Sequence, residues 1–97
     1  MDSFVYIMAN HHNTTIYVGI TSHLQKRVWE HKSGIDKRSF TYKYNCHKLV
    51  YFEQFGDIHS AIAREKQIKR WTRERKNKMI GRSNLGWDDL AADWEGF

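Results

Sequence analysis

The sequence predicts a small α+β domain in which a three-stranded, mostly antiparallel sheet is flanked by helices. Three short runs, residues 3–10, 15–20 and 48–55, are rich in β-branched and aromatic residues, which is typical of strands. Elsewhere, apolar residues recur at the spacing of three and four that indicates amphipathic helices. A chain of 97 residues, 40% of them hydrophobic, can enclose one compact core. We therefore expect a single domain over residues 1–97.

The first two predicted strands form a hairpin, because only the four residues His-His-Asn-Thr separate them. A loop centred on His11 and His12 places Tyr6 and Tyr17 roughly opposite each other on one face of the sheet. The sequence thus predicts two tyrosine side chains close together in space.

A helix follows the second strand. Thr21 or Ser22 can cap its first turn, and it runs to about Ser33, where Gly34 is placed to end it. Residues 35–46 then form a polar connection to the third strand.

Two more helices are predicted after the third strand. Gly56 breaks the strand, and Asp57 can cap a helix that spans residues 58–71. Thr72 can cap a further helix over residues 73–80.

Residues 85–97 form an acidic C-terminal tail. The last ten residues hold four acidic side chains and no basic one. The apolar residues at helical spacing are Trp87, Leu90, Ala91 and Trp94. This pattern predicts an amphipathic helix with an acidic outer face.

The composition excludes several classes of protein. No apolar run approaches the roughly 18 residues of a membrane span, and the N-terminus lacks the basic and apolar regions of a signal peptide. One cysteine, Cys46, allows neither an internal disulfide nor a thiolate-rich zinc site, which favours a reducing, cytoplasmic setting. Without a glycine-rich phosphate loop, we expect no nucleotide cofactor.

The charge distribution favours a polyanionic partner. The net charge is +5, and residues 1–87 alone carry +9, from 16 basic and 7 acidic side chains. Residues 64–78 contain eight lysines and arginines around Trp71, which suits contact with phosphates, with Lys69 and Arg73 as candidates. The alternative is a solvated helix face.

Two predicted helices place polar side chains where apolar ones are expected. Arg27 and His31 share the apolar face of the first helix, and Glu65 interrupts the apolar stripe of the second. Arg27 could extend to solvent and His31 could be hydrogen-bonded within the core. Glu65 could pair with Lys69, one turn on. Taken together, however, several polar groups at core positions indicate a functional site.

Five segments of the chain resemble the GIY-YIG nuclease superfamily, in particular its small stand-alone members. They are FVYIM at residues 4–8, IYVGIT at 16–21, LQKRVWEH at 24–31, AIAREKQIK at 61–69 and Lys-Asn at 76–77. The resemblance extends over residues 3–90, with all elements in the same order. Two features depart from the family: the first motif, Phe4-Val5-Tyr6, lacks its glycine, and Ile20 stands where some relatives have a lysine.

The resemblance implies metal-assisted hydrolysis of phosphodiester bonds. It implies that the catalytic residues are Tyr6, Tyr17, Arg27, His31 and Glu65, and it places Gly19 and Asn77 at the substrate, beside Lys69 and Arg73. Glu65 would hold one Mg²⁺ or Mn²⁺ with waters and the phosphate, since a two-metal site needs several carboxylates. Arg27 would neutralise charge on the phosphoryl oxygens. Tyr6 or Tyr17 would orient or deprotonate the attacking water, directly or by relay through His31.

The expected substrate is DNA rather than RNA, bound mainly through its phosphates and so with little sequence specificity. Two alternatives stay open. One is a catalytically inactive, basic nucleic-acid-binding module of the same fold. The other is an interaction module whose acidic tail docks on its own basic groove. The sequence leaves the strandedness of the substrate and the oligomeric state open.

Overall fold

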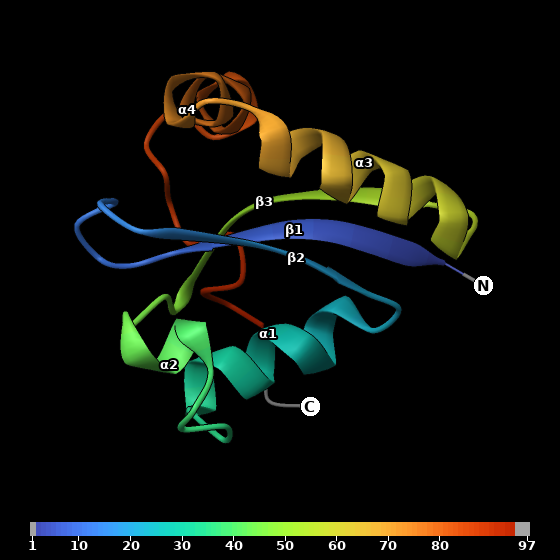
Figure 1. The fold of residues 1–97 in the computed structure, drawn as a ribbon. Helices are drawn as coiled ribbons and strands as arrows, with labels where there is room; N and C mark the ends of the chain where they lie inside the picture. The colour runs from blue at the N-terminus through green and yellow to red at the C-terminus, as the bar shows by residue number, and fades with distance from the viewer. Residues whose placement is uncertain (1, 95–97) are drawn as a thin grey trace.

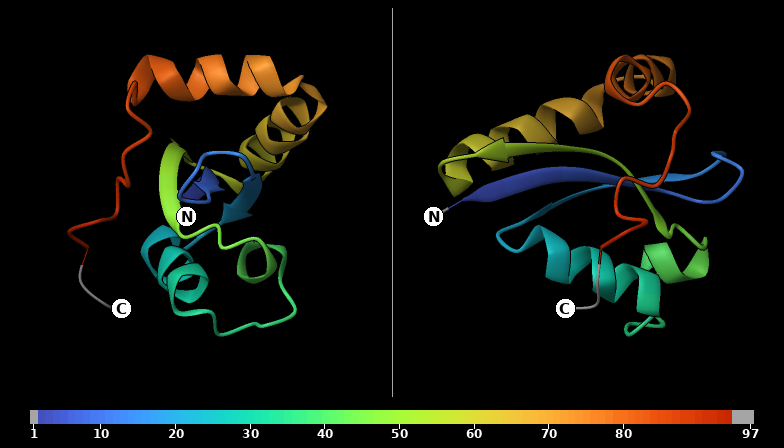
Figure 2. Two further views of the ribbon diagram at one scale, coloured as in Figure 1. Left: turned by 90° about the vertical axis from the view of Figure 1, so that its left-hand side faces the viewer. Right: turned by 180° about the vertical axis from the view of Figure 1, so that it is seen from behind.

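The computed structural model describes residues 2–94, which form a three-stranded sheet between two layers of helices (Figure 1). The elements are β1 (Ser3–Ala9), β2 (Ile16–Thr21), α1 (Leu24–Ser33), α2 (Phe40–Lys43), β3 (Lys48–Phe55), α3 (Ile58–Arg70) and α4 (Arg73–Ser83). The helices α3 and α4 lie on one side of the sheet, and α1 and α2 lie on the other (Figure 2). The predicted α+β fold class is confirmed. No helix within the described range is long and apolar enough to cross a membrane.

The sheet has the order β2-β1-β3, with both pairs antiparallel, so that β2 and β3 are its edges. In the hairpin, Tyr6 pairs with Gly19 and Met8 pairs with Tyr17. The two tyrosines share one face, as predicted, but they are diagonal neighbours and not directly opposite.

The difference arises in the hairpin loop, which closes around Asn10. The Asn10 side-chain oxygen accepts hydrogen bonds from the backbone N–H groups of Thr14 (2.9 Å) and Thr15 (3.0 Å). Asn13 takes the left-handed conformation that such a loop requires, with φ of 59°. These contacts centre the loop one residue later than the sequence predicts, and the register of the tyrosines shifts accordingly.

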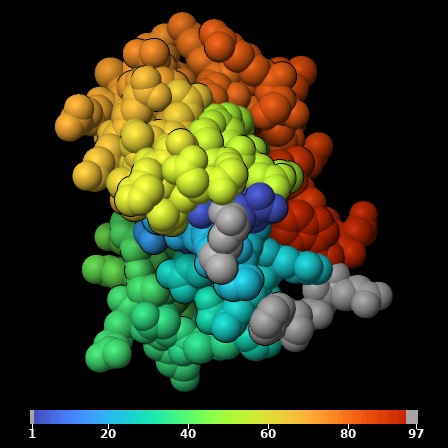
Figure 3. All heavy atoms as spheres, turned by 90° about the vertical axis from the view of Figure 1, so that its right-hand side faces the viewer, coloured from blue at the N-terminus to red at the C-terminus, as the bar shows by residue number. Residues whose placement is uncertain are grey.

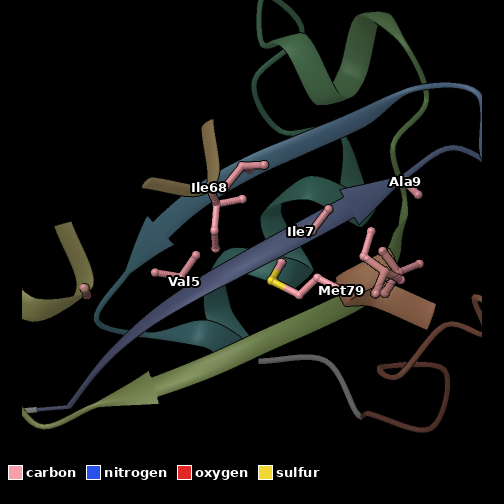
Figure 4. Packing of buried hydrophobic residues seen from close by; sticks show 9 residues of the cluster. Val5, Ile7, Ala9, Ile68 and Met79 are labelled. Carbon is pink, nitrogen blue, oxygen red and sulfur yellow. The ribbon is translucent and has the colours of Figure 1, made fainter. Parts of the chain in front are cut away.

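Alternate residues of β1 face two different hydrophobic clusters. Val5, Ile7 and Ala9 point towards α3 and α4, where they pack with Ile68 and Met79 (Figure 4).

On the other face, Tyr6 and Met8 pack against Leu24 and Val28 of α1 and against Leu49 of β3. Tyr6 is therefore part of a core, which limits how far its side chain can move.

Most helix boundaries follow the predicted caps. The Asp57 carboxylate accepts a hydrogen bond from the Ser60 N–H at 2.8 Å, and the Thr72 hydroxyl accepts one from the Arg75 N–H at 3.2 Å. Gly34 ends α1 in the left-handed conformation, with φ of 68°.

The predicted N-cap of α1 is wrong. The cap position is His23, without a side-chain cap. The Thr21 hydroxyl accepts a hydrogen bond from the His23 N–H at 3.1 Å, which turns the chain before the helix begins. The helix thus starts at Leu24, later than the sequence predicts.

The polar connection of residues 35–46 contains the helix α2, which the sequence analysis missed. Ser39 caps it by accepting a hydrogen bond from the Tyr42 N–H at 3.2 Å. Four residues are too few to generate a helical periodicity.

The predicted tail helix is also wrong for the described part of the tail, residues 85–94, which forms turns. The Asp89 carboxylate accepts hydrogen bonds from the N–H groups of Leu49 and Ala91, both at 3.0 Å, and pairs with Lys32. The Leu90 N–H donates to the Leu49 carbonyl at 2.8 Å. The tail thus crosses the edge of the sheet at the start of β3, from the layer of α4 to that of α1, and its side-chain bonds replace those of a helix (Figure 2). Residues 95–97 lie outside the described part.

Candidate active site

The two tyrosines lie together on the face of the sheet that α1 covers. Their ring centroids are 6.2 Å apart. A Cβ atom on Gly19 would lie 2.6 Å from the Tyr6 hydroxyl and 2.7 Å from the Tyr17 ring. Glycine is therefore required at this position because two aromatic rings approach the backbone closely.

His31, in the last turn of α1, joins Tyr6 to the segment that follows the helix. Its Nε2 lies 2.8 Å from the Tyr6 hydroxyl, and its Nδ1 lies 2.7 Å from the Thr41 hydroxyl. Thr41 in turn lies 3.2 Å from the Ser39 hydroxyl. A continuous chain of polar groups thus runs from β1 through α1 to α2.

Burial lowers the pKa of His31 to about 4, and the positive charge of Arg27 acts in the same direction. The residue is only 5% exposed, and its ring is neutral at pH 7. A neutral imidazole has one donor and one acceptor nitrogen, which matches its two hydroxyl partners. The interpretation of His31 as a hydrogen-bonded core histidine is correct, and it does not conflict with a place in the site.

Arg27 lies one turn before His31, with its side chain 40% exposed. Its Nη1 contacts the Glu30 carboxylate at 3.3 Å. Burial raises the pKa of Tyr6 well above its usual value, and the charge of Arg27 only partly offsets this. The Tyr6 hydroxyl is therefore protonated at neutral pH.

A small polar cavity of about 70 Å³ opens beside these residues. It is lined by Arg27, Glu30, His31, Ile35, Asp36 and Ser39. Through this cavity solvent reaches Arg27 and His31.

The two tyrosines differ in accessibility. Tyr6 is fully buried, with 0% of its surface exposed, whereas Tyr17 is half-buried on the edge strand β2. The Tyr17 ring lies 5.5 Å from that of His31. Tyr17 is thus the tyrosine of the pair that an external ligand can reach.

Glu65 lies on α3, which packs on the opposite face of the sheet from α1 (Figure 1). Its side chain is 15% exposed, and its carboxylate pairs with Lys69 at 3.5 Å. Within residues 2–94, Lys69 is the ion-pair partner of this carboxylate, and no hydrogen bond or ion pair joins Glu65 to the tyrosine cluster. Although α3 packs against the strands β1 and β2, Glu65 and the tyrosine cluster lie on opposite faces of the sheet. The apolar stripe that Glu65 interrupts is predicted from Ile58, Ala61, Ile62 and Ile68. In the structure Ala61 and Ile68 are buried, but Ile58 is exposed.

Arg73 and Asn77 contact the hairpin loop and each other. The Arg73 guanidinium donates to the carbonyls of Asn13 (2.8 Å) and Thr14 (3.1 Å) and, through Nε, to the Asn77 side-chain oxygen at 2.8 Å. These bonds tie the start of α4 to the loop, away from the tyrosine cluster. The Lys69 side chain is half exposed beside Glu65.

The structure therefore brings five of the predicted site residues into one cluster. They are Tyr6, Tyr17, Gly19, Arg27 and His31. Glu65 and Lys69 form a separate pair on α3, and Arg73 and Asn77 form another on α4. Thr41 and Ser39 extend the cluster and were missed. No sequence signal marked them, because a buried threonine in a polar connection has no periodic pattern.

Comparisons with known proteins identify the family and the fold. The family model of the GIY-YIG catalytic domain matches residues 2–79. The UPF0213 protein of Syntrophus aciditrophicus (strain SB) is 33% identical over 78 residues, which cover 80% of this chain and 88% of that protein. The UPF0213 protein of Clostridium perfringens is 34% identical over 83 residues, covering 86% and 87%. The NMR structure of the UPF0213 protein BH0048 from Bacillus halodurans shares the fold with a TM-score of 0.59, at 21% identity and complete coverage of both chains.

Proposed function

The chain belongs to the GIY-YIG family, a family of nucleases, and we propose that it is an endonuclease that hydrolyses phosphodiester bonds in DNA with one divalent metal ion. The observation that supports this most strongly is the cluster in which the Tyr6 and Tyr17 rings lie together against Gly19. His31 contacts both tyrosines, and the positive charge of Arg27 acts on Tyr6 and on His31. We further propose that it acts in the cytoplasm and reads little of the DNA sequence, since phosphate contacts carry no sequence information.

Arg27 binds the scissile phosphate in this mechanism. Its guanidinium remains charged at any physiological pH, and its planar fork matches two phosphoryl oxygens. Its half-exposed position lets it leave Glu30 for a phosphate. Charge that develops on these oxygens in the transition state strengthens this contact.

Tyr17 orients the attacking water, because it is the accessible tyrosine. The Tyr6 hydroxyl serves as a hydrogen-bond donor, because burial raises its pKa and keeps it protonated. The neutral His31 ring and Thr41 hold Tyr6 in place beside Gly19.

Glu65 is the residue that would hold the metal. A carboxylate is the oxygen ligand that Mg²⁺ and Mn²⁺ prefer, and Mg²⁺ keeps most of its waters, so one protein carboxylate suffices. Residues 2–94 contain no group of three metal-ligating side chains, which fits one largely hydrated ion better than two metals. When bound, the ion supplies positive charge that stabilises the leaving oxygen.

The basic helices α3 and α4 support a nucleic acid as the partner, with Lys69, Arg73 and Asn77 as candidate phosphate contacts. A second candidate function is a nucleic-acid-binding module without turnover. The contact that favours it is the Glu65–Lys69 pair, because a carboxylate that stays with a lysine does not ligate a metal.

A cleavage panel distinguishes the two functions. Single-stranded and double-stranded DNA and RNA are incubated with the protein in Mg²⁺, Mn²⁺ or EDTA. We expect cleavage of DNA with either metal and none in EDTA. Binding that shifts DNA on a gel without cleavage under any metal would leave the binding module as the function.

Two substitutions test the assigned roles. We expect Glu65→Ala to abolish cleavage and leave the fold intact. The matched control is Glu74→Ala, which removes another glutamate paired with a lysine one turn on, at 3.4 Å, on α4. Undiminished cleavage by the Glu65 variant would refute the metal assignment. Arg27→Ala should cost at least about 2 kcal/mol of transition-state stabilisation, as loss of an oxyanion donor does.

A further inference from the structure

The segment that follows α1 exposes three aromatic side chains. Phe40, Tyr42 and Tyr44 are 43%, 41% and 42% exposed. They belong to α2 and its C-terminal end, which protrude from the surface as the green region of Figure 3. Exposing large aromatic rings to water costs free energy. Three of them gathered on and beside the short helix α2 therefore indicate a binding surface.

Two of these rings continue the tyrosine cluster outwards. The Phe40 ring lies 6.0 Å from that of Tyr17, with an interplanar angle of 32°, and the Tyr44 ring lies 4.6 Å from that of Phe40, at 45°. Tyr17 in turn contacts His31 at 5.5 Å. We call Tyr17, Phe40 and Tyr44 the aromatic ladder. It leads without a break from the buried cluster to solvent.

Positive charge accompanies the ladder. Residues 35–46 carry three basic side chains, Lys37, Arg38 and Lys43, against the one acidic side chain of Asp36. The Lys43 ammonium lies 5.5 Å from the centre of the Tyr44 ring. Aromatic faces flanked by cations match the chemistry of a nucleotide, which joins a flat base to a negatively charged phosphate.

We propose that the aromatic ladder stacks unpaired bases, so that the substrate of the proposed nuclease is single-stranded nucleic acid or the single-stranded part of a branched one. This inference rests on the proposed function. In a duplex the bases already stack on one another, and their faces are not available to a protein ring. A base on Phe40 or Tyr44 places the neighbouring phosphates near Tyr17, where the proposed chemistry occurs.

The other exposed aromatic surface serves as a contrast. Phe52 is 40% exposed on β3 and packs edge-on against Phe4 and Trp94. It lies on the strand at the other edge of the sheet from Tyr17, and within residues 2–94 its ring contacts are to Phe4 and Trp94 and not to the aromatic ladder. Phe52 is therefore a control of equal exposure.

Binding measured in EDTA tests the proposal without requiring cleavage. Fluorescence anisotropy compares a short single-stranded DNA with its blunt duplex, for the wild type and for Tyr44→Leu, Phe40→Leu and Phe52→Leu. Leucine keeps an apolar side chain and removes the ring face. We expect the wild type to prefer the single strand. We expect Tyr44→Leu and Phe40→Leu to weaken single-strand binding roughly tenfold, with duplex binding unchanged, and Phe52→Leu to match the wild type.

Equal or tighter binding of the duplex by the wild type, or unchanged single-strand binding by Tyr44→Leu, would overturn the proposal. Tyr44 is the decisive position, because its ring lies outside both hydrophobic clusters, and an unchanged circular dichroism spectrum verifies that its variant folds. This test of the ladder is distinguishable from the test of the proposed nuclease activity. If Tyr44→Leu loses single-strand binding but the wild type cleaves no substrate, the ladder is supported and the enzyme is rejected. Cleavage of single-stranded DNA at the wild-type rate by Tyr44→Leu keeps the enzyme and rejects the ladder.

Discussion

His31 shows at the scale of one residue how burial sets charge. In the unfolded chain its pKa is near 6.5, and in the folded protein burial and Arg27 lower it to about 4. Between these values the unfolded state binds more protons than the folded state. The free energy of unfolding therefore falls as the pH falls from about 6.5 towards 4.

We expect this one group to cost about 3 kcal/mol of stability between pH 7 and pH 4, from a shift of roughly 2.5 units at 1.36 kcal/mol each. Urea unfolding at pH 7, 6 and 5 measures the decline. His31→Gln should be less stable at pH 7, because it loses the contacts to Tyr6 and Thr41, but its stability should change less over the same range. Equal pH slopes for the two proteins would contradict the assignment.

Gly19 leads to a prediction about packing. A Cβ at this position meets the Tyr6 and Tyr17 rings at 2.6–2.7 Å, and Tyr6 is buried and cannot yield. We expect Gly19→Ala to cost about 1–3 kcal/mol of stability through overpacking, and to impair any cleavage by displacing the rings. Chemical denaturation measures the loss.

The control for Gly19 is Gly81 in α4, where a Cβ meets nothing within 4 Å. Gly81→Ala should stabilise the protein by up to about 1 kcal/mol, because alanine is the better helix former. Similar effects of the two substitutions would mean that steric contact with the tyrosines does not decide the outcome.

At the scale of elements, the tail acts as a strap across the first residues of β3. An edge strand exposes unpaired backbone groups, and here the Asp89 carboxylate and the Leu90 N–H pair with those of Leu49. Asp89 also pairs with Lys32, which links the strap to α1. The acidic residue thus meets its lysine partner beside β3, at the opposite edge of the sheet from Tyr17 and β2.

We expect Asp89→Ala to destabilise the domain by about 2 kcal/mol, since it removes hydrogen bonds to a charged group and leaves the Leu49 N–H without this partner. Asp93→Ala, at an exposed tail residue, should change stability by less than about 0.5 kcal/mol. Thermal unfolding compares them. Deletion of residues 86–97 should likewise destabilise the domain; if it instead left stability intact and raised activity, the tail would act on the basic groove.

At the scale of the whole molecule, net charge and local ring contacts contribute to binding in different ways. Residues 1–87 carry a net charge of +9 and attract phosphates. This attraction arises from the release of counterions, and so it weakens as the salt concentration rises. Stacking on the aromatic ladder does not depend on counterions in this way.

Raising the salt concentration from about 50 to about 200 mM should therefore weaken binding of both single-stranded and duplex DNA by an order of magnitude or more. The proposed preference for the single strand should persist. Anisotropy titrations at several salt concentrations give both quantities. If the preference for the single strand disappeared as the salt concentration rose, that preference would be due to charge alone and not to stacking.

The sequence by itself determined the strands, the three long helices and the residues that depart from the apolar pattern. Local periodicity and caps such as Asp57 and Thr72 specify these features, and they require only neighbours in the chain. It also identified Tyr6, Arg27 and His31 as polar residues on core-facing positions, which burial of His31 and Tyr6 bears out.

Tertiary structure alone decided which of those residues meet. The hairpin register, shifted by the Asn10 side chain, makes the tyrosines diagonal neighbours around Gly19. His31 bonds to Thr41, and Asp89 bonds to Leu49. These partners are too far apart in the sequence for a local pattern to predict them. The predicted tail helix is absent from residues 85–94 for the same reason, because these residues bond to the edge of β3, which is distant in sequence and exists only once the sheet has formed.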